Sequence, residues 1–177
     1  VSILGPTGSG KTSLLNILAS RVPCGASNGS KLTGSFRVNG QMRDEQKFRR
    51  VSAYVLQDDL LFAHLTVFET LMLAANFYLP DELPDSEKKE VVMGVLTELG
   101  LLKAKDTIIG DDKVRGVSGG ERKRANIAAQ LICDPAVLFL DEPTSGLDSF
   151  QAQSVMEAMK VLSCVLCALF PSPIFLS

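Results

Sequence analysis

The sequence predicts an α/β fold with a parallel sheet, a small antiparallel β portion and a helical insert. An apolar segment at residues 1–4 runs into a glycine-rich loop and then a helix over 12–20, the order expected of a βα unit. The uninterrupted apolar run 136–140 is typical of a parallel strand covered on both faces. Between these two regions, the sequence from residue 66 onward shows the spacing of amphipathic helices. A strand of four residues needs a sheet behind it, so we expect the natural chain to begin before Val1.

The segments after the first helix follow local turn and strand signals. Residues 23–30 form a loop, and residues 32–38 alternate loosely in polarity, as a strand does. Asn39 and Gly40 then give a hairpin turn signal. Residues 51–56 are expected to form another short strand.

Helical spacing dominates the middle of the chain. Thr66 and Glu69 form a capping box, because each side chain can satisfy a free amide of the first turn. A polar break at 80–86 separates this helix from a second one, which is closed by Gly100. The apolar positions with helical spacing are Val67, Phe68, Leu71, Met72, Ala75 and Tyr78 in the first helix, Val91, Val92, Val95, Leu96 and Leu99 in the second, and Ala125, Ala128, Leu131 and Ile132 in a third.

Composition excludes several classes of protein. The 177 residues carry 18 Lys and Arg against 20 Asp and Glu, a net charge of −2, so no basic surface for a nucleic acid is indicated. Tryptophan is absent and aromatic residues make up 6%, which argues against a stacking platform for single strands. Four irregularly spaced cysteines do not form a disulfide framework, so a reducing, intracellular setting is favoured. No signal peptide is visible, and prolines interrupt the uncharged stretch 161–177, a poor candidate for a membrane span.

The glycine-rich loop matches G-x-x-x-x-G-K-[ST], a phosphate-binding pattern. Its glycines let backbone amides turn toward phosphate oxygens, and the following helix directs its positive dipole end at the same anion. The lysine brings a positive charge to the terminal phosphates, and the threonine can ligate Mg²⁺. The alternative, an ordinary glycine turn before a helix, is disfavoured by the flanking segments. The candidate nucleotide-binding residues are Gly5, Pro6, Thr7, Gly8, Ser9, Gly10, Lys11 and Thr12.

Two carboxylates directly follow the apolar run 136–140. Asp141 is placed to hold Mg²⁺, directly or through water, because it ends a predicted parallel strand. Glu142 is placed to orient or deprotonate an attacking water. Alone, such a pair is more often a helix cap or a solvated turn. The glycine-rich loop in the same chain favours the catalytic interpretation.

A second anion-binding helix start is expected at Ser118, Gly119, Gly120 and Glu121. One chain does not need two such sites for one triphosphate, so the second is expected to serve a nucleotide held by another copy. Its alternative interpretation is a plain helix N-cap.

Taken in order, these elements resemble an ABC-transporter nucleotide-binding domain. The order is the loop at 5–12, the Ser-Gly-Gly-Glu element at 118–121, the strand ending in Asp141-Glu142, and Ser-Gly-Leu-Asp at 145–148. The resemblance covers roughly residues 1–160. The stretches YVLQDDLLFAHLTVFETL (54–71) and VRGVSGGERKRANIAAQLICDP (114–135) resemble the white-type subfamily G, the eukaryotic half-transporters.

The resemblance implies a P-loop NTPase fold that binds and hydrolyses ATP with Mg²⁺. Gln57 would contact Mg²⁺ and the attacking water, and would relay the nucleotide state to a membrane domain. Asp148 would lie at the interface between two copies, which would sandwich two ATP molecules. A helical subdomain at about 66–109 would face a transmembrane domain that follows this chain in the full-length protein. The domain would therefore lie at the cytoplasmic face of a membrane, and its partners would include no nucleic acid.

The sequence departs from the family pattern in several places. No aromatic residue precedes the loop to stack on adenine, and the switch histidine is missing, since His64 lies far upstream and is expected in a loop or at the surface. Residues 161–177 form an atypical tail, which a retained intron, a shifted frame or a gene-model error would explain, and its Cys164-x-x-Cys167 pair is interpreted as incidental. Two alternatives stay open. One is a truncated, catalytically deficient fragment, and the other is a soluble ABC ATPase of DNA repair or translation.

Overall fold

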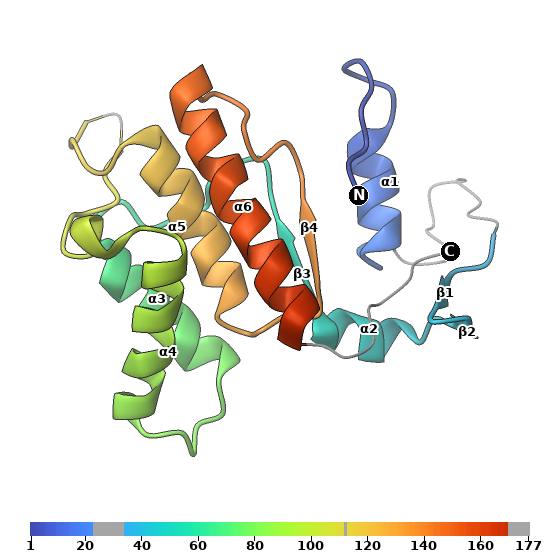
Figure 1. Cartoon of the computed structure of the whole chain (residues 1–177), viewed down its shortest axis with the longest axis horizontal. Coiled ribbons are helices and arrows are strands. Elements are labelled where there is room, and N and C mark those ends of the chain that lie inside the picture. Colours follow the sequence, from blue (N-terminus) through green and yellow to red (C-terminus); the bar gives the residue numbers. More distant parts are fainter. Residues whose placement is uncertain (23–33, 112, 170–177) are drawn as a thin grey trace.

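The computed structural model of the chain describes residues 1–22, 34–111 and 113–169, with side chains through residue 160 (Figure 1). The predicted loop at 23–30 and the start of the predicted strand at 32–38 lie outside the described residues. In chain order the elements are α1 (Lys11–Leu18), β1 (Arg37–Val38), β2 (Gln41–Met42), α2 (Glu45–Val51), β3 (Ser52–Val55), α3 (Val67–Tyr78), α4 (Asp85–Glu98), the 3-10 helix η1 (Leu102–Ala104), α5 (Gly119–Leu131), β4 (Val137–Leu140) and α6 (Ser149–Leu169).

The described strands form two small sheets. β3 and β4 pair in parallel, with Ser52 opposite Val137 and Val55 opposite Leu140, so the parallel strand predicted from the apolar run is confirmed. β1 and β2 pair antiparallel as a hairpin. Its turn residues are Asn39 and Gly40, with φ of 50° and 79°, the left-handed values that a two-residue hairpin turn of this type requires.

The prediction of a strand over residues 1–4 is wrong for this structure. The segment has no regular secondary structure, and Val1 and Leu4 are exposed. A strand exists only where a neighbouring strand accepts and donates its backbone hydrogen bonds. The sheet formed by the described strands β3 and β4 gives this segment no such neighbour. An apolar run of four residues cannot by itself reveal whether that neighbour exists.

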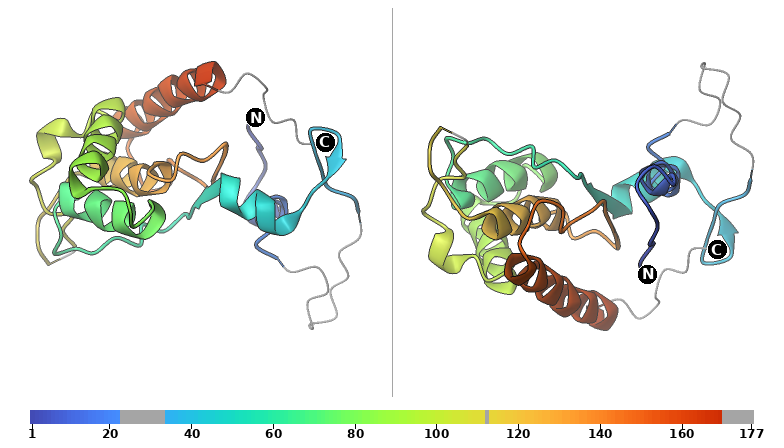
Figure 2. Two further views of the ribbon diagram at one scale, coloured as in Figure 1. Left: turned by 90° about the horizontal axis from the view of Figure 1, so that it is seen from below. Right: turned by 90° about the horizontal axis from the view of Figure 1, so that it is seen from above.

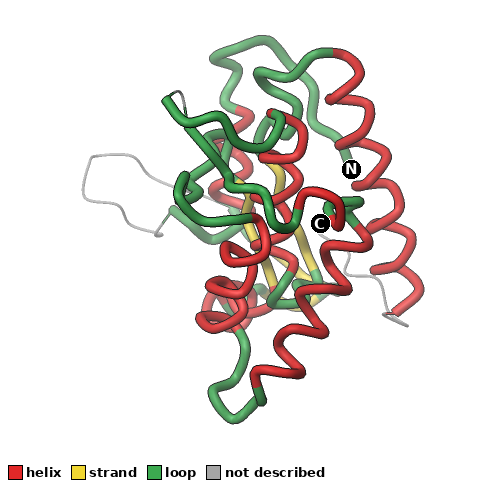
Figure 3. The backbone as a smooth tube through the Cα atoms, turned by 90° about the vertical axis from the view of Figure 1, so that its left-hand side faces the viewer, coloured by secondary structure: helices red, strands yellow, loops and turns green. Residues whose placement is uncertain are grey.

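Two apolar clusters lie on opposite faces of the β3–β4 pair. Along β4, Leu138 and Leu140 contact the larger cluster, and Val137 and Phe139 contact the smaller one, so both faces of the strand are covered as its sequence predicts. Figure 2 shows α1, α2 and the β1–β2 hairpin on one side and helices α3–α6 on the other. Figure 3 views the molecule from the side of α3 and α4, with the strands behind them.

The larger cluster joins α3, α4, α5 and α6, and its fully buried members include Leu71, Leu96, Ile127 and Val155. The smaller cluster is built on Phe139, whose ring meets that of Phe48 edge-on at a centroid distance of 6.3 Å. Phe48 lies in α2, a helix that the sequence analysis did not identify.

The starts of the helices in the middle of the chain can be compared with the capping signals in the sequence. Thr66 and Glu69 form the predicted capping box at α3. The Thr66 backbone amide and hydroxyl donate to the Glu69 carboxylate and lower the pKa of that carboxyl. The second helix starts at Asp85, earlier than its apolar spacing at 91–99 indicated, and Gly100 follows its C-cap with φ of 64°. His64 lies in an exposed turn, as expected.

α6 runs from Ser149 to Leu169 and crosses residue 160, where the resemblance was expected to end. The side chains of Cys164 and Cys167 lie outside those the structure describes. Among the helices of the described residues, none combines the length and the apolar character that a membrane span requires.

Candidate functional site

The glycine-rich loop lies exposed ahead of α1. Gly8 and Gly10 have φ of 82° and 87°, a left-handed backbone that suits glycine. Lys11 folds back over the loop, and its Nζ donates to the carbonyl oxygens of Gly5 at 3.0 Å and Pro6 at 3.1 Å. No side chain caps the start of α1, and its first turn holds no acidic residue. The loop therefore offers free helix amides and an ammonium group to an anion.

Thr12 joins this loop to the end of β4. Its hydroxyl donates to Asp141 Oδ1 at 3.2 Å, although the two residues are 129 positions apart. Asp141 is 4% exposed, and its second oxygen accepts a hydrogen bond from the Tyr54 hydroxyl at 3.2 Å. A hydroxyl oxygen and a carboxylate oxygen next to a phosphate loop are hard ligands of the kind that Mg²⁺ prefers. The donor set at this point fits Mg²⁺ held between protein and phosphates.

The partly buried Tyr54 beside Asp141 gives this site a pH dependence. Partial burial, and after it the charge and hydrogen bond of the Asp141 carboxylate, together raise the pKa of the Tyr54 phenol to about 12. In the unfolded chain Tyr54 loses its proton near its ordinary pKa of 10.0. The contribution of this raised pKa to the stability of the folded chain is therefore complete below about pH 10. It is then lost as the pH rises toward about 12.

We expect the phenolate absorbance of the wild-type chain to show a step near pH 12, and Tyr54→Phe to remove it. Tyr78→Phe, which removes the other of the two tyrosines, is the matched control and retains the step. A step that survives Tyr54→Phe would show that Tyr54 is not held against Asp141.

Glu142 and Gln57 meet across the β3–β4 pair. Gln57 follows β3 by two positions, and Glu142 follows β4 by two. The Gln57 side-chain amide donates to Glu142 Oε2 at 3.1 Å. Glu142 has φ of 47°, a left-handed conformation that is uncommon for a residue other than glycine. The chain turns sharply here and holds the carboxylate at the exposed end of the sheet, where it can reach a water molecule.

The Ser118 element lies at the start of α5 as a second capping box. Glu121 Oε2 accepts from the Ser118 amide and hydroxyl, each at 2.8 Å, and the Ser118 hydroxyl accepts from the Glu121 amide at 3.3 Å. A Cβ on Gly119 or Gly120 would approach Gln151 of α6 to 3.2 Å and 3.3 Å. A side chain at either position would therefore require Gln151 to shift slightly.

Asp148 caps the start of α6, where its Oδ1 accepts from the Gln151 amide at 2.8 Å. Figure 1 shows the first turns of α1, α5 and α6 at the same end of the molecule, with α1 apart from the other two. The structure thus brings Thr12, Gln57, Asp141 and Glu142 to one edge. The first turns of α5 and α6 lie close together, since Gln151 of α6 borders Gly119 and Gly120 of α5, and both turns lie apart from α1 (Figure 1).

Sequence reasoning missed Tyr54, Asp59 and Lys123. Tyr54 lies in the strand that leads to Gln57, and its contact with Asp141 joins residues 87 positions apart, which no local pattern reveals. Lys123 was part of a basic stretch that follows the Ser118 element, yet its side chain is 3% exposed and pairs with Asp59 at 2.9 Å. Arg122 and Arg124, its neighbours in the basic stretch, are partly exposed, and basic composition alone does not distinguish Lys123 from them.

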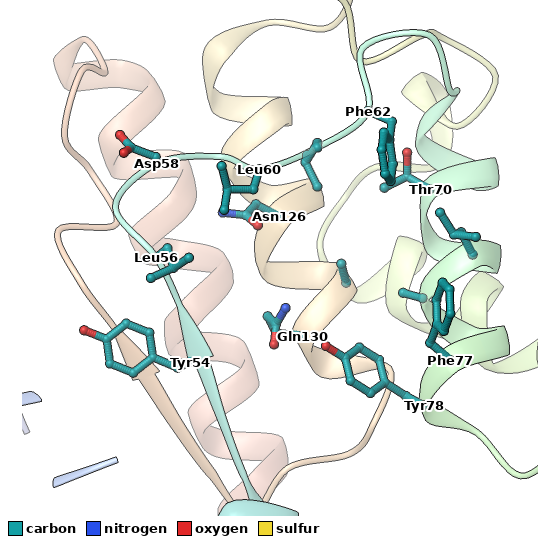
Figure 4. A pocket seen from close by; sticks show the side chains of 14 residues that line it. Tyr54, Leu56, Asp58, Leu60, Phe62, Thr70, Phe77, Tyr78, Asn126 and Gln130 are labelled. Carbon is teal, nitrogen blue, oxygen red and sulfur yellow. The ribbon is translucent and has the colours of Figure 1, made fainter. Parts of the chain in front are cut away.

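An apolar groove adjoins this edge between α3, α5 and the segment after β3. It encloses about 370 Å³. Figure 4 shows Leu56 and Leu60 on the segment after β3, with Phe77 and Tyr78 on α3 across the groove. Leu60 is 75% exposed and Phe77 is 79% exposed, so large apolar side chains rim the groove on both sides.

Comparison with known proteins gives matches along most of the chain. The family model described as ABC transporter matches residues 1–145. ABC transporter G family member 16 of Arabidopsis thaliana is 49% identical over 160 residues, which are 90% of this chain and 21% of that protein. ABC transporter G family member 5 of Oryza sativa subsp. japonica is 48% identical over 163 residues, which are 92% of this chain and 20% of that protein. The chain thus spans about a fifth of the length of these curated relatives.

A solved structure is also similar. It is cbiO1 from Clostridium perfringens, described as part of the ABC transporter complex cbiONQ. The two folds superpose with a TM-score of 0.70 at 27% sequence identity, over 92% of this chain and 61% of cbiO1. The likeness agrees with the P-loop NTPase fold that the resemblance implied.

Proposed function

Because the chain belongs to the ABC transporter family and is a nucleotide-binding domain of the subfamily G type, we propose that it binds and hydrolyses ATP with Mg²⁺. The observation that carries the proposal is the edge at which the phosphate loop, Asp141 and the Gln57–Glu142 pair converge. The ATPase chemistry of the family fits these groups. The roles of individual residues are our assignments.

The loop residues 5–12 bind the phosphates of ATP. Lys11 now donates to two carbonyl oxygens of the loop, and a phosphate oxygen replaces these weaker acceptors because it carries a full negative charge. Thr12 and Asp141 would hold Mg²⁺, which would neutralise charge on the terminal phosphates.

Glu142 takes a proton from water while the water oxygen bonds to the terminal phosphorus. The bond between that phosphorus and its bridging oxygen breaks, giving ADP and phosphate. Gln57 orients Glu142 and the water through its side-chain amide, which already donates to the carboxylate at 3.1 Å. The attacking water is correctly placed only when the side chains of Gln57 and Glu142 both reach it.

A second copy of the domain completes each site. α5, whose start carries the Ser118 element, begins apart from α1 (Figure 1), yet it presents a glycine-rich helix start of the kind that binds anions. We assign Ser118 to Glu121 to the nucleotide held by the partner copy, and Asp148 to the interface between the copies. Two ATP molecules would then lie between two copies related by two-fold symmetry.

The groove beside Gln57 is where we place the contact with a transmembrane domain. Leu60, Phe62 and Phe77 are 75%, 65% and 79% exposed, and exposed apolar side chains grouped in this way mark interaction surfaces. The relatives are named ABC transporters, so the full-length protein would act at a membrane, with this domain at its cytoplasmic face. The chemical nature of its cargo would be set by the transmembrane domain.

Dimerisation on ATP tests the composite site. In chains that carry Glu142→Gln to slow hydrolysis, we expect MgATP to double the mass measured by light scattering. Adding Ser118→Arg should keep the chain monomeric, since a long cation replaces the hydroxyl at the partner's nucleotide. Thr66→Arg is the matched control, because it disrupts the other capping box without touching this surface. Dimerisation of the Ser118→Arg chain would contradict the composite site.

A further inference from the structure

Lys123 is a buried lysine in α5 with a specific pair of acceptors. Its side chain is 3% exposed, and its Nζ lies 2.9 Å from Asp59 Oδ1. The same ammonium donates to the backbone carbonyl oxygen of Gln57 at 2.8 Å. A buried ammonium is costly unless charge and hydrogen bonds compensate it. Both forms of compensation come here from the loop that carries Gln57.

α5 contacts that loop through a second side chain as well. Asn126 donates through its side-chain amide to the same Asp59 oxygen at 2.7 Å. Lys123 and Asn126 are three positions apart and therefore lie on one face of the helix. In Figure 4, Asn126 lies on α5 close to the segment of chain that bears Leu60. α5 therefore holds the loop on both sides of Asp58, at Gln57 and at Asp59.

Regular secondary structure and apolar packing give this loop little support. Residues 56–60 belong to no helix or strand, and Leu56 and Leu60 are 37% and 75% exposed. Apolar burial therefore contributes little to the position of this segment. The hydrogen bonds and the ion pair from Lys123 and Asn126, together with the Gln57–Glu142 hydrogen bond, tie it to the body of the domain.

We propose that Lys123 is a positioning residue that locks the Gln57 loop to α5, so that the Gln57 side chain reaches Glu142. Because α5 begins with the Ser118 element, the lock makes this helix start and Gln57 move as one body. Engagement of Ser118 by a second copy is thereby transmitted to the group that orients the attacking water. The inference rests on the proposed function, in which Ser118 and Gln57 act on nucleotide.

Amide hydrogen exchange measures the lock in the whole 177-residue chain without requiring activity. In Lys123→Met, which keeps an apolar stem and removes the ammonium, exchange of residues 57–61 should accelerate about tenfold or more. Lys88→Met is the matched control, since Lys88 is also buried but donates to Asn76 on α3, and it should leave this segment unchanged. Unchanged exchange at 57–61 in folded Lys123→Met would overturn the proposal.

Asp59→Asn supplies a second, milder variant in case Lys123→Met does not fold. It should accelerate exchange of the same segment, and the double variant should exchange no faster than the faster single variant, because both changes break one lock. Additive effects would overturn the proposal, since they would show that Lys123 and Asp59 act separately.

Steady-state ATP hydrolysis separates positioning from a merely structural role. We expect Lys123→Met to lower kcat about tenfold with KM unchanged, because the phosphate loop does not contact Lys123. An unchanged kcat would overturn the proposal. A wild-type chain that neither binds nor hydrolyses ATP would instead contradict the proposed function, and the exchange data would still decide whether Lys123 locks the loop.

Discussion

Lys11→Ala is expected to raise the Kd for MgATP about a hundredfold or more, since the ammonium would donate charge-assisted hydrogen bonds to the terminal phosphates, each contributing about 1.5–3 kcal/mol. Lys11 reaches over the glycine-rich loop, where its ammonium already satisfies two carbonyl oxygens. No other lysine or arginine of the described residues donates a hydrogen bond to this loop. Alanine therefore leaves the terminal phosphates to the helix amides and Mg²⁺ alone.

Titration calorimetry with MgATP measures this effect directly. Lys103→Ala is the control, because Lys103 is an exposed lysine in η1, remote from the loop, and its loss should leave the Kd unchanged. The free energy of unfolding should also stay close to the wild-type value, since Lys11 bonds only to exposed carbonyl groups. Equal Kd values for the wild-type chain and Lys11→Ala would remove residues 5–12 from the nucleotide site.

Glu142→Gln is expected to lower kcat for ATP hydrolysis by about a hundredfold to ten-thousandfold, the range over which a positioned general base contributes. The carboxamide keeps the shape of the side chain and can still meet Gln57, but it cannot take the proton from water. The Kd for MgATP should change little, because Glu142 is paired with Gln57 and does not contact the phosphate loop.

Single-turnover hydrolysis with a fixed amount of MgATP gives the rate of the chemical step. Glu157→Gln, on α6, is a matched control, because it makes the same chemical change at an exposed glutamate that lies outside the site. We expect the control to hydrolyse ATP at the wild-type rate. A wild-type rate in Glu142→Gln would remove this residue from the role of base.

Local stereochemistry explains why part of this structure could be predicted from sequence. The capping box at Thr66 depends on residues three positions apart and forms as predicted, and the helix start predicted at Ser118 carries a second box of the same kind. The Asn39–Gly40 turn likewise needs only two residues that tolerate positive φ. The apolar run of β4 also predicts a strand correctly, because both of its faces meet apolar clusters.

Features that depend on distant residues could not be predicted in the same way. Residues 1–4 have the composition of a strand, but a strand also needs a partner, and the described strands give it none. Lys123 belongs to a basic stretch of a kind that is usually solvated, and its burial follows from the position of Asp59, 64 residues earlier in the chain. The pairing of Gln57 with Glu142 depends likewise on the parallel register of β3 and β4.

Sites shared between two copies are the central claim of this account, and mixing two inactive variants tests it most directly. Lys11→Ala removes the phosphate loop's cation, and Ser118→Arg blocks the helix start offered to the partner's nucleotide. Neither variant alone should hydrolyse ATP. An equal mixture should recover hydrolysis, up to about half of the wild-type rate, since only mixed pairs form a complete site and each mixed pair contains one of the two. A mixture no more active than its two components, beside an active wild-type chain, would contradict the account.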